Sequence, residues 1–270
     1  TTGSEVYLKD VSLDLSKKGA KNIEKSLNRS VEKGKISADK CKEILSRLKP
    51  IENYSEAQDI DFAIEAAIEK IEVKKKIFKE LDEAMPEKTI IGSCTSALSV
   101  TDMAAVTKRP QKCIGVHFHH PPVQMELVEI IKGYSTEDEV EKLVIEYLAK
   151  AGKVPVPCKD YPGFVSSRVG IIMINEGIQT LADGVSTVEN IDKACVAGFK
   201  WPMGPLALAD LIGLDTCLMG LEDMYNRLGD RFKPSPLLRQ MVYSGNLGVK
   251  TGKGFYDYSN PHARVRHNEG

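Results

Sequence analysis

A short stretch of the chain concentrates residue types suited to moving a proton. Three histidines occur in Gly115-Val-His-Phe-His-His-Pro-Pro-Val123, and Glu129 follows twelve residues after His117. Oxidation of an alcohol to a ketone removes a hydroxyl proton while a hydride leaves carbon, and a histidine suits that proton transfer. A carboxylate behind the ring fixes its tautomer. A polar strand end upstream, Ser93-Cys-Thr-Ser-Ala97, could supply a hydroxyl to hold the substrate oxygen, so these side chains are suited to alcohol oxidation.

Two other interpretations fit the same histidines. A histidine at a strand end is as often a structural residue as a catalytic one. A metal site is the second alternative, because His117 and His119 lie on one face of the expected strand and neutral imidazoles bind zinc or nickel. Apart from Glu126 or Glu129, no residue completes a compact set of ligands. We therefore expect no metal.

A dinucleotide cofactor that accepts the hydride would need a dinucleotide-binding domain to place it beside the histidines. A dinucleotide-binding domain starts with a strand, a Gly-x-Gly-x-x-Gly turn and a helix, and an acid follows about 20 residues later. The chain contains no such glycine turn, whereas Asp10 ends an expected strand at residues 5–10 and suits the acid. An Asp there is also a common turn or cap residue. Because loss of a central strand would leave backbone groups unpaired, we expect the missing first strand to lie upstream of Thr1.

Strands and helices alternate in the first part of the chain, which predicts a Rossmann-like, doubly wound parallel α/β sheet. Beyond Asp160-Tyr-Pro-Gly163 only helices are predicted. We expect a Rossmann-like NAD-binding domain at residues 1–161, an all-helical domain at 162–258 and a flexible tail at 259–270. The expected strands lie at residues 60–66, 89–94, 113–118, 127–131 and 153–156; the expected helices lie at 15–33, 37–48, 73–84, 100–106, 136–151, 164–181, 188–198, 205–228 and 236–244. The turn at residues 248–254 is expected to be structural.

Composition excludes several functional classes. The formal net charge of -1 gives no basic surplus for nucleic acid. The longest apolar stretches, such as Val169 to Ile174, are too short to span a membrane, and we find no signal peptide at Thr1. Six scattered cysteines include no Cys-x-x-Cys pair, so we expect reduced thiols in a cytoplasmic protein.

Several longer stretches match one family in both order and spacing. They are Thr95-Ser-Ala-Leu-Ser99, His117-Phe with Pro121, Leu127-Val-Glu-Ile-Ile131, Asp160-Tyr-Pro-Gly-Phe164, Pro202-Met-Gly-Pro-Leu206, Ala209-Asp-Leu-Ile-Gly-Leu-Asp-Thr216 and Lys250-Thr-Gly-Lys-Gly-Phe-Tyr256. Through them the chain, from about Glu5 to Tyr258, resembles the L-3-hydroxyacyl-CoA dehydrogenases. The resemblance implies NAD-dependent oxidation of an L-3-hydroxyacyl-CoA to the 3-ketoacyl-CoA, or the reverse, in fatty-acid or butyrate-type metabolism. It also implies a homodimer formed through the helical domain.

The resemblance assigns a first group of residues to catalysis and to the substrate. His117 falls on the family's general base and Glu129 on its partner acid. Ser96 falls on the substrate-binding serine, which also lies beside the cofactor. Ser167 stands where the family has an asparagine that holds the substrate oxygen. His120 also replaces an asparagine, since the family's His-Phe-Phe-Asn-Pro is His-Phe-His-His-Pro here.

A second group is implied in cofactor and CoA binding. Asp10 falls on the acid of the adenosine ribose, which favours NAD because a carboxylate repels a 2′-phosphate. Glu69 and Lys74 fall near the nicotinamide half, while Ser26 and Lys33 fall where CoA is bound. Cys94 is a third position at which the family usually has asparagine. These departures keep open a dehydrogenase of a different 3-hydroxy acid and a CoA-ester-binding paralogue with little catalysis.

Overall fold

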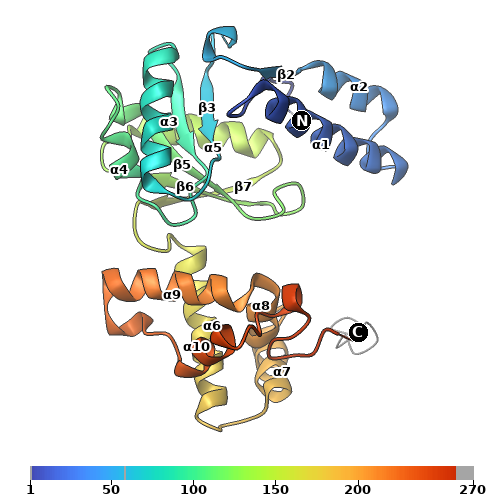
Figure 1. Ribbon diagram of the computed structural model, residues 1–270, viewed down its shortest axis with the longest axis vertical. Helices are drawn as coiled ribbons and strands as arrows, with labels where there is room; N and C mark the ends of the chain where they lie inside the picture. Colours follow the sequence, from blue (N-terminus) through green and yellow to red (C-terminus); the bar gives the residue numbers. More distant parts are fainter. Residues whose placement is uncertain (1, 58, 260–270) are drawn as a thin grey trace. The chain divides into compact units, whose positions relative to one another are not determined.

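The structure is a computed structural model that describes residues 2–57 and 59–259. The chain divides into two compact units, Thr1–Asp160 and Tyr161–Gly270 (Figure 1). Apart from Ser259, the expected flexible tail lies outside the described residues. None of the described helices is long and apolar enough to cross a membrane.

The first unit is an α/β structure, and the predicted Rossmann-like class is confirmed. Its larger sheet has five strands, all of which were expected from the sequence. They are β3 (Phe62–Glu65), β4 (Ile90–Ser93), β5 (Cys113–Phe118), β6 (Leu127–Lys132) and β7 (Val154–Lys159), in that order across the sheet.

One strand of this unit was not predicted. Residues 37–48 were expected to form a single helix, but α2 (Ala38–Ser46) ends earlier and Leu48–Ile51 form β2. This strand pairs in parallel with β1 (Val6–Lys9) in a separate two-stranded sheet. Pro50 lies within this strand, and a strand with one neighbour tolerates a proline because its other edge needs no N–H donor.

The expectation of parallel pairing throughout is wrong at one place. Strands β5 and β6 are antiparallel, whereas β3–β4, β4–β5 and β6–β7 are parallel. Residues 119–126 alone connect β5 to β6, and a parallel pair needs a crossover of about a dozen residues or more. The antiparallel pairing matters for the site, because it sets a residue of β5 directly against a residue of β6.

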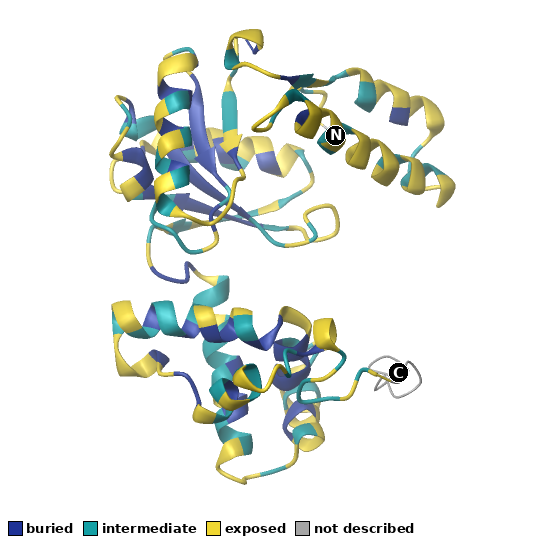
Figure 2. Cartoon of the chain, in the orientation of Figure 1, coloured by how far each residue is buried: buried dark blue, intermediate teal, exposed yellow. Residues whose placement is uncertain are grey.

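Helices cover the five-stranded sheet. Helix α5 (Asp138–Lys150) packs Val140, Val144 and Leu148 against one face, and Figure 1 shows α3 (Ile71–Ala84) on the other side of the sheet. The short α4 (Val100–Ala104) contacts β5. Strands β4, β5 and β6 are accordingly among the most buried parts of the unit, whereas α1 (Leu13–Glu32) is mostly exposed (Figure 2).

Within residues 161–259 the second unit contains helices and no strand, as predicted. Residues 205–228, expected as one helix, form two helices, because Gly213 between them has a φ of 102°. Only glycine adopts such a conformation at little cost, and it ends α8. The helices are α6 (Ser166–Ala182), α7 (Val188–Phe199), α8 (Pro205–Ile212), α9 (Leu214–Leu228) and α10 (Pro236–Tyr243); their core includes Ile174, Ile178, Leu206, Leu214, Leu221 and Leu238.

A buried carboxylate fixes the last described turn of the chain. Asp210 on α8 accepts hydrogen bonds from the N–H groups of Phe255 and Tyr256, both at 2.9 Å, and from the hydroxyl of Tyr258 at 3.1 Å. Burial raises the pKa of Asp210 against these bonds. The contacts agree with the structural role expected for the turn at residues 248–254.

Candidate active site

His117 and Glu129 face each other across two strands. They are register partners on β5 and β6, and His117 Nδ1 lies 2.8 Å from Glu129 Oε2. Opposed residues of an antiparallel pair share one face, so their side chains meet. Glu129 is fully buried and His117 is 7% exposed. A carboxylate accepts but does not donate, so Nδ1 carries the proton and the lone pair of the neutral ring is on Nε2.

His119 joins this pair just beyond the end of β5. Its Nε2 lies 3.7 Å from the same Oε2 of Glu129, and its ring centroid lies 4.9 Å from that of His117. Burial and the neighbouring His117 hold the pKa of His119 below its usual value, although Glu129 opposes the shift. His120 is exposed. Of the two carboxylates considered for the metal alternative, Glu129 forms a compact group with His117 and His119, with ligand atoms within 4.8 Å of one another.

Glu69 organises the loop that carries Ser96. Its Oε1 accepts hydrogen bonds from the Thr95 hydroxyl at 2.6 Å and from the N–H groups of Ser96 at 2.8 Å and Ala97 at 3.1 Å. Burial alone would raise the pKa of Glu69, but these bonds and the Lys74 ammonium hold it below its usual value. The loop follows β4, and the Ser96 side chain is exposed.

The Lys74 ammonium is enclosed by two carboxylates, and its predicted place beside the cofactor stays a prediction. Nζ lies 2.8 Å from Glu65 Oε1 and 3.3 Å from Glu69 Oε2. Glu65, at the end of β3, also accepts a hydrogen bond of 2.6 Å from the Ser93 hydroxyl. Sequence reasoning missed Glu65, although an acid that ends a buried strand requires a partner. Lys74 thus contacts Glu69, the residue that holds the Ser96 loop.

The other residues predicted to bind cofactor, CoA or substrate lie on several different elements. Asp10 directly follows β1, and its Oδ1 accepts a hydrogen bond of 2.7 Å from the N–H of Val11. Ser26 and Lys33 are exposed, Ser26 within α1 and Lys33 at its C-cap. Ser167 lies in the first turn of α6, in the second unit, where it is half-buried. Its assignment beside the substrate stays a prediction.

The first unit carries its candidate cofactor-binding residues at the ends of strands, where a nicotinamide dinucleotide would bind. Asp10, Glu69, Ser96 and His119 each follow the carboxyl end of a strand, namely β1, β3, β4 and β5. Such strand ends are where ligands bind in open α/β sheets. The carboxylate of Asp10 suits ribose hydroxyls. No glycine-rich turn occurs in the sequence, so no residue of this chain is assigned to the pyrophosphate.

The fold and the site together define a class of protein, a nicotinamide-dependent dehydrogenase with an α/β unit and a helical unit. Comparison with family models makes this specific. Residues 1–161 match the 3-hydroxyacyl-CoA dehydrogenase NAD-binding domain, and residues 163–258 match the C-terminal domain of the same family. The chain belongs to the 3-hydroxyacyl-CoA dehydrogenase family. It is an oxidoreductase whose cofactor is NAD.

Individual relatives agree with this assignment over nearly the whole chain. A probable 3-hydroxybutyryl-CoA dehydrogenase of Bacillus subtilis is 45% identical, covering 95% of this chain and 90% of its own. A 3-hydroxybutyryl-CoA dehydrogenase of Bradyrhizobium diazoefficiens is 44% identical, covering 95% and 88%. The crystal structure of (S)-3-hydroxybutyryl-CoA dehydrogenase from Ralstonia eutropha aligns with a TM-score of 0.91 at 40% identity, covering 96% and 92%.

Proposed function

We propose that this dehydrogenase acts on short 3-hydroxyacyl-CoA esters, with 3-hydroxybutyryl-CoA as the first substrate to test, and that His117 is its general acid and base. The observation that carries the catalytic assignment is the buried contact of 2.8 Å between His117 Nδ1 and Glu129 Oε2. The substrate assignment follows the names of the relatives that cover most of the chain. Cytoplasmic fatty-acid or butyrate-type metabolism is the corresponding setting.

The proton chemistry follows from the tautomer of His117. With the Nδ1 proton donated to Glu129, Nε2 accepts the proton of the substrate hydroxyl. The imidazolium formed in this step is stabilised by the buried Glu129 carboxylate. Bound NAD supplies the hydride acceptor. In the reverse direction Nε2–H returns the proton to the forming alkoxide.

Other side chains position the substrate and the cofactor. The hydroxyl of Ser96 holds the substrate oxygen, and Glu69 maintains the loop on which Ser96 lies through its bonds to the Ser96 and Ala97 N–H groups. Asp10 binds the adenosine ribose. Lys33 is an exposed cation at the end of α1, and together with Ser26 it contacts the CoA phosphates and pantetheine. His120 contacts the acyl-CoA.

A dehydrogenase of a different 3-hydroxy acid is the second candidate. Ser167 is shorter than the asparagine of the family, and His120 replaces another asparagine. Both changes alter the hydrogen bonds that are offered to a substrate, so they favour an altered acyl group or carrier. Dependence of turnover on the CoA moiety distinguishes the two candidates.

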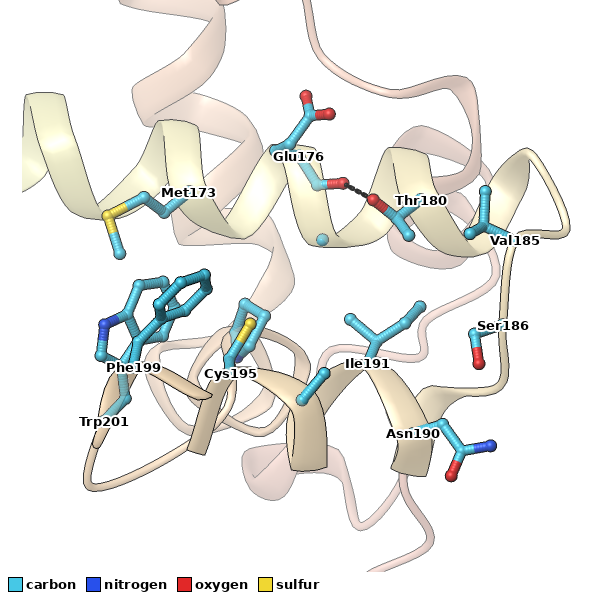
Figure 3. Close-up of a pocket in the computed structure, with 13 residues that line it drawn as sticks. Met173, Glu176, Thr180, Val185, Ser186, Asn190, Ile191, Cys195, Phe199 and Trp201 are labelled. Atoms are coloured by element: carbon cyan, nitrogen blue, oxygen red, sulfur yellow. Dashed lines mark hydrogen bonds between the residues drawn. The ribbon is translucent and has the colours of Figure 1, made fainter. Parts of the chain in front are cut away.

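We also propose a homodimer formed through the helical unit. Apolar side chains are exposed there, including Phe199 at 68% and Met219 at 66%. A cavity of about 400 Å³ opens between α6 and α7; in Figure 3 the Phe199 and Trp201 rings lie beside Met173 at one end of it, whereas the Glu176 carboxylate points away. Exposed apolar surface of this kind is typical of a protein interface.

The dimer is tested by sedimentation. Phe199→Glu is expected to shift the protein from dimer to monomer at micromolar concentration, because it places a charge in an apolar interface. Val11→Glu, on the exposed loop after β1, is the matched control. A wild-type chain that sediments as a monomer would contradict the proposed assembly.

The catalytic proposal is tested by following NADH absorbance with acetoacetyl-CoA. We expect NADH consumption by the wild-type protein and a loss of at least about a hundredfold in turnover for His117→Ala. Acetoacetate without CoA, as a parallel substrate, reports the dependence on the carrier. Undiminished turnover in His117→Ala would reject the general-base role, and equal turnover with free acetoacetate would favour the second candidate.

A further inference from the structure

We propose that His117, His119 and Glu129 form a binding site for a divalent transition-metal ion of the Zn²⁺ class, and that the ion inhibits the dehydrogenase reaction when bound. The inhibition rests on the proposed catalytic role of His117. The binding itself rests on geometry alone, since the ligand atoms of the three side chains lie within 4.8 Å of one another.

The separations suit tetrahedral coordination. Zinc binds imidazole nitrogen at about 2.0–2.1 Å and carboxylate oxygen at about 2.0–2.2 Å, so tetrahedral donors lie about 3.4 Å apart. Glu129 Oε2 lies 2.8 Å from His117 Nδ1 and 3.7 Å from His119 Nε2. These two distances bracket the required value. The two nitrogens lie within 4.8 Å of each other, and adjustment of the partly exposed His119 ring would bring both to bonding distance from one ion.

The donor set and its surroundings also suit such an ion. Two histidines and one glutamate are a set that zinc uses in proteins, with the fourth position left for water. Glu129 is fully buried, so its charge is not screened by solvent. The side chain of His119 is 27% exposed, which gives the ion a route from solvent. The backbone of β5 and β6 holds His117 and Glu129 in register before the ion arrives.

The consequence for catalysis follows from the ring proton. In the metal-free pair, Nδ1 of His117 carries the proton and Nε2 carries the lone pair. An ion that binds Nδ1 and Glu129 uses the Nδ1 lone pair, and the ring proton moves to Nε2, with no net release of protons and no change of oxidation state. Nε2 then has no lone pair to accept the substrate proton. In the reverse direction the neutral ring is a much weaker acid than imidazolium.

Binding is measured separately from activity. Protein treated with a chelator and then freed of it is titrated with Zn²⁺ by calorimetry, and with Co²⁺ by visible absorption, which reports tetrahedral coordination. We expect one ion per chain. His119→Gln should raise the Zn²⁺ dissociation constant at least about tenfold, because it removes one of three ligands. His120→Gln is the matched control, since it makes the same change at the adjacent, exposed histidine and should leave the dissociation constant unchanged.

Inhibition is then measured with NADH and acetoacetyl-CoA, each variant relative to its own metal-free rate. We expect equimolar Zn²⁺ to abolish wild-type turnover reversibly, with EDTA restoring it, and His119→Gln to need at least about tenfold more Zn²⁺. Equal Zn²⁺ affinity in wild type and His119→Gln, or thiolate charge-transfer bands with Co²⁺, would overturn the metal site. Tight His119-dependent binding in a protein without dehydrogenase activity would support the site and reject the proposed catalytic role.

Discussion

Lys74 and Glu65 form an ion pair that is enclosed by the first unit. The Nζ–Oε1 distance is 2.8 Å, and each side chain is 1% exposed. Lys74 also lies 3.3 Å from Glu69, the residue that holds the Ser96 loop. The pair therefore connects the interior of the sheet to the loop on which the proposed substrate serine lies.

Removal of Lys74 should destabilise the protein strongly. We expect Lys74→Met to lower the free energy of unfolding by about 3–5 kcal/mol, because it leaves Glu65 with an unpaired buried charge. Urea denaturation followed by circular dichroism measures the change. Lys76→Met is the control, since Lys76 is 78% exposed and its loss should cost less than about 0.5 kcal/mol. Equal losses of stability in the two variants would contradict the structural role of the pair.

The orientation of His117 should depend on Glu129. We expect Glu129→Gln to lower kcat by about 10²–10⁴-fold with little change in KM, because an amide neither fixes the productive tautomer nor stabilises imidazolium. Steady-state kinetics with NADH and acetoacetyl-CoA measure both constants. Glu126→Gln makes the same change at an exposed position and should be close to wild type. A wild-type kcat in Glu129→Gln would remove Glu129 from the mechanism.

The contribution of Glu69 to stability should depend on pH in a defined direction. Folding holds the pKa of Glu69 below 4.5, so its contribution is present above that value and is lost as the pH falls through the folded pKa. We expect Glu69→Gln to cost about 0.5–1 kcal/mol at neutral pH, since the group is partly exposed, and less in acid. Urea denaturation from about pH 7 to about pH 3 tests this. Glu72→Gln, at an exposed position of α3, is the control. A destabilisation by Glu69→Gln that increases as the pH falls would contradict the lowered pKa of Glu69.

The turn at residues 248–254 should not tolerate a side chain at Gly254. A Cβ there would overlap the carboxylate of Asp210, which accepts hydrogen bonds from the N–H groups of Phe255 and Tyr256. We expect Gly254→Ala to cost about 1–3 kcal/mol. Gly198→Ala, where a Cβ meets no atom within 4 Å, should be neutral or stabilise α7 by up to about 1 kcal/mol. Thermal unfolding of both variants measures the contrast, and a Gly254→Ala protein as stable as wild type would contradict the packing.

Local patterns in the sequence were sufficient for most of the elements and for the family. The alternation of apolar runs and helical periodicity predicted the strands of the larger sheet and, apart from the break at Gly213, the helices of the second unit, because those periods depend only on neighbouring residues. The motifs around His117, Glu129 and Ser96 predicted the dehydrogenase class, which the family comparison confirmed. The helix predicted at 37–48 was wrong in its last residues, since the β1 partner of Leu48–Ile51 is distant in sequence.

The tertiary structure decided how closely the side chains of the site meet. That Glu129 lies opposite His117 depends on the register of β5 and β6, and a shift by one residue would turn either side chain to the other face. The pairing of Lys74 with Glu65 and the approach of His119 to Glu129 depend in the same way on how a strand packs against the element that follows it. Spacing along a sequence does not encode such contacts, because they arise only when several elements pack together and exclude water from the charges between them.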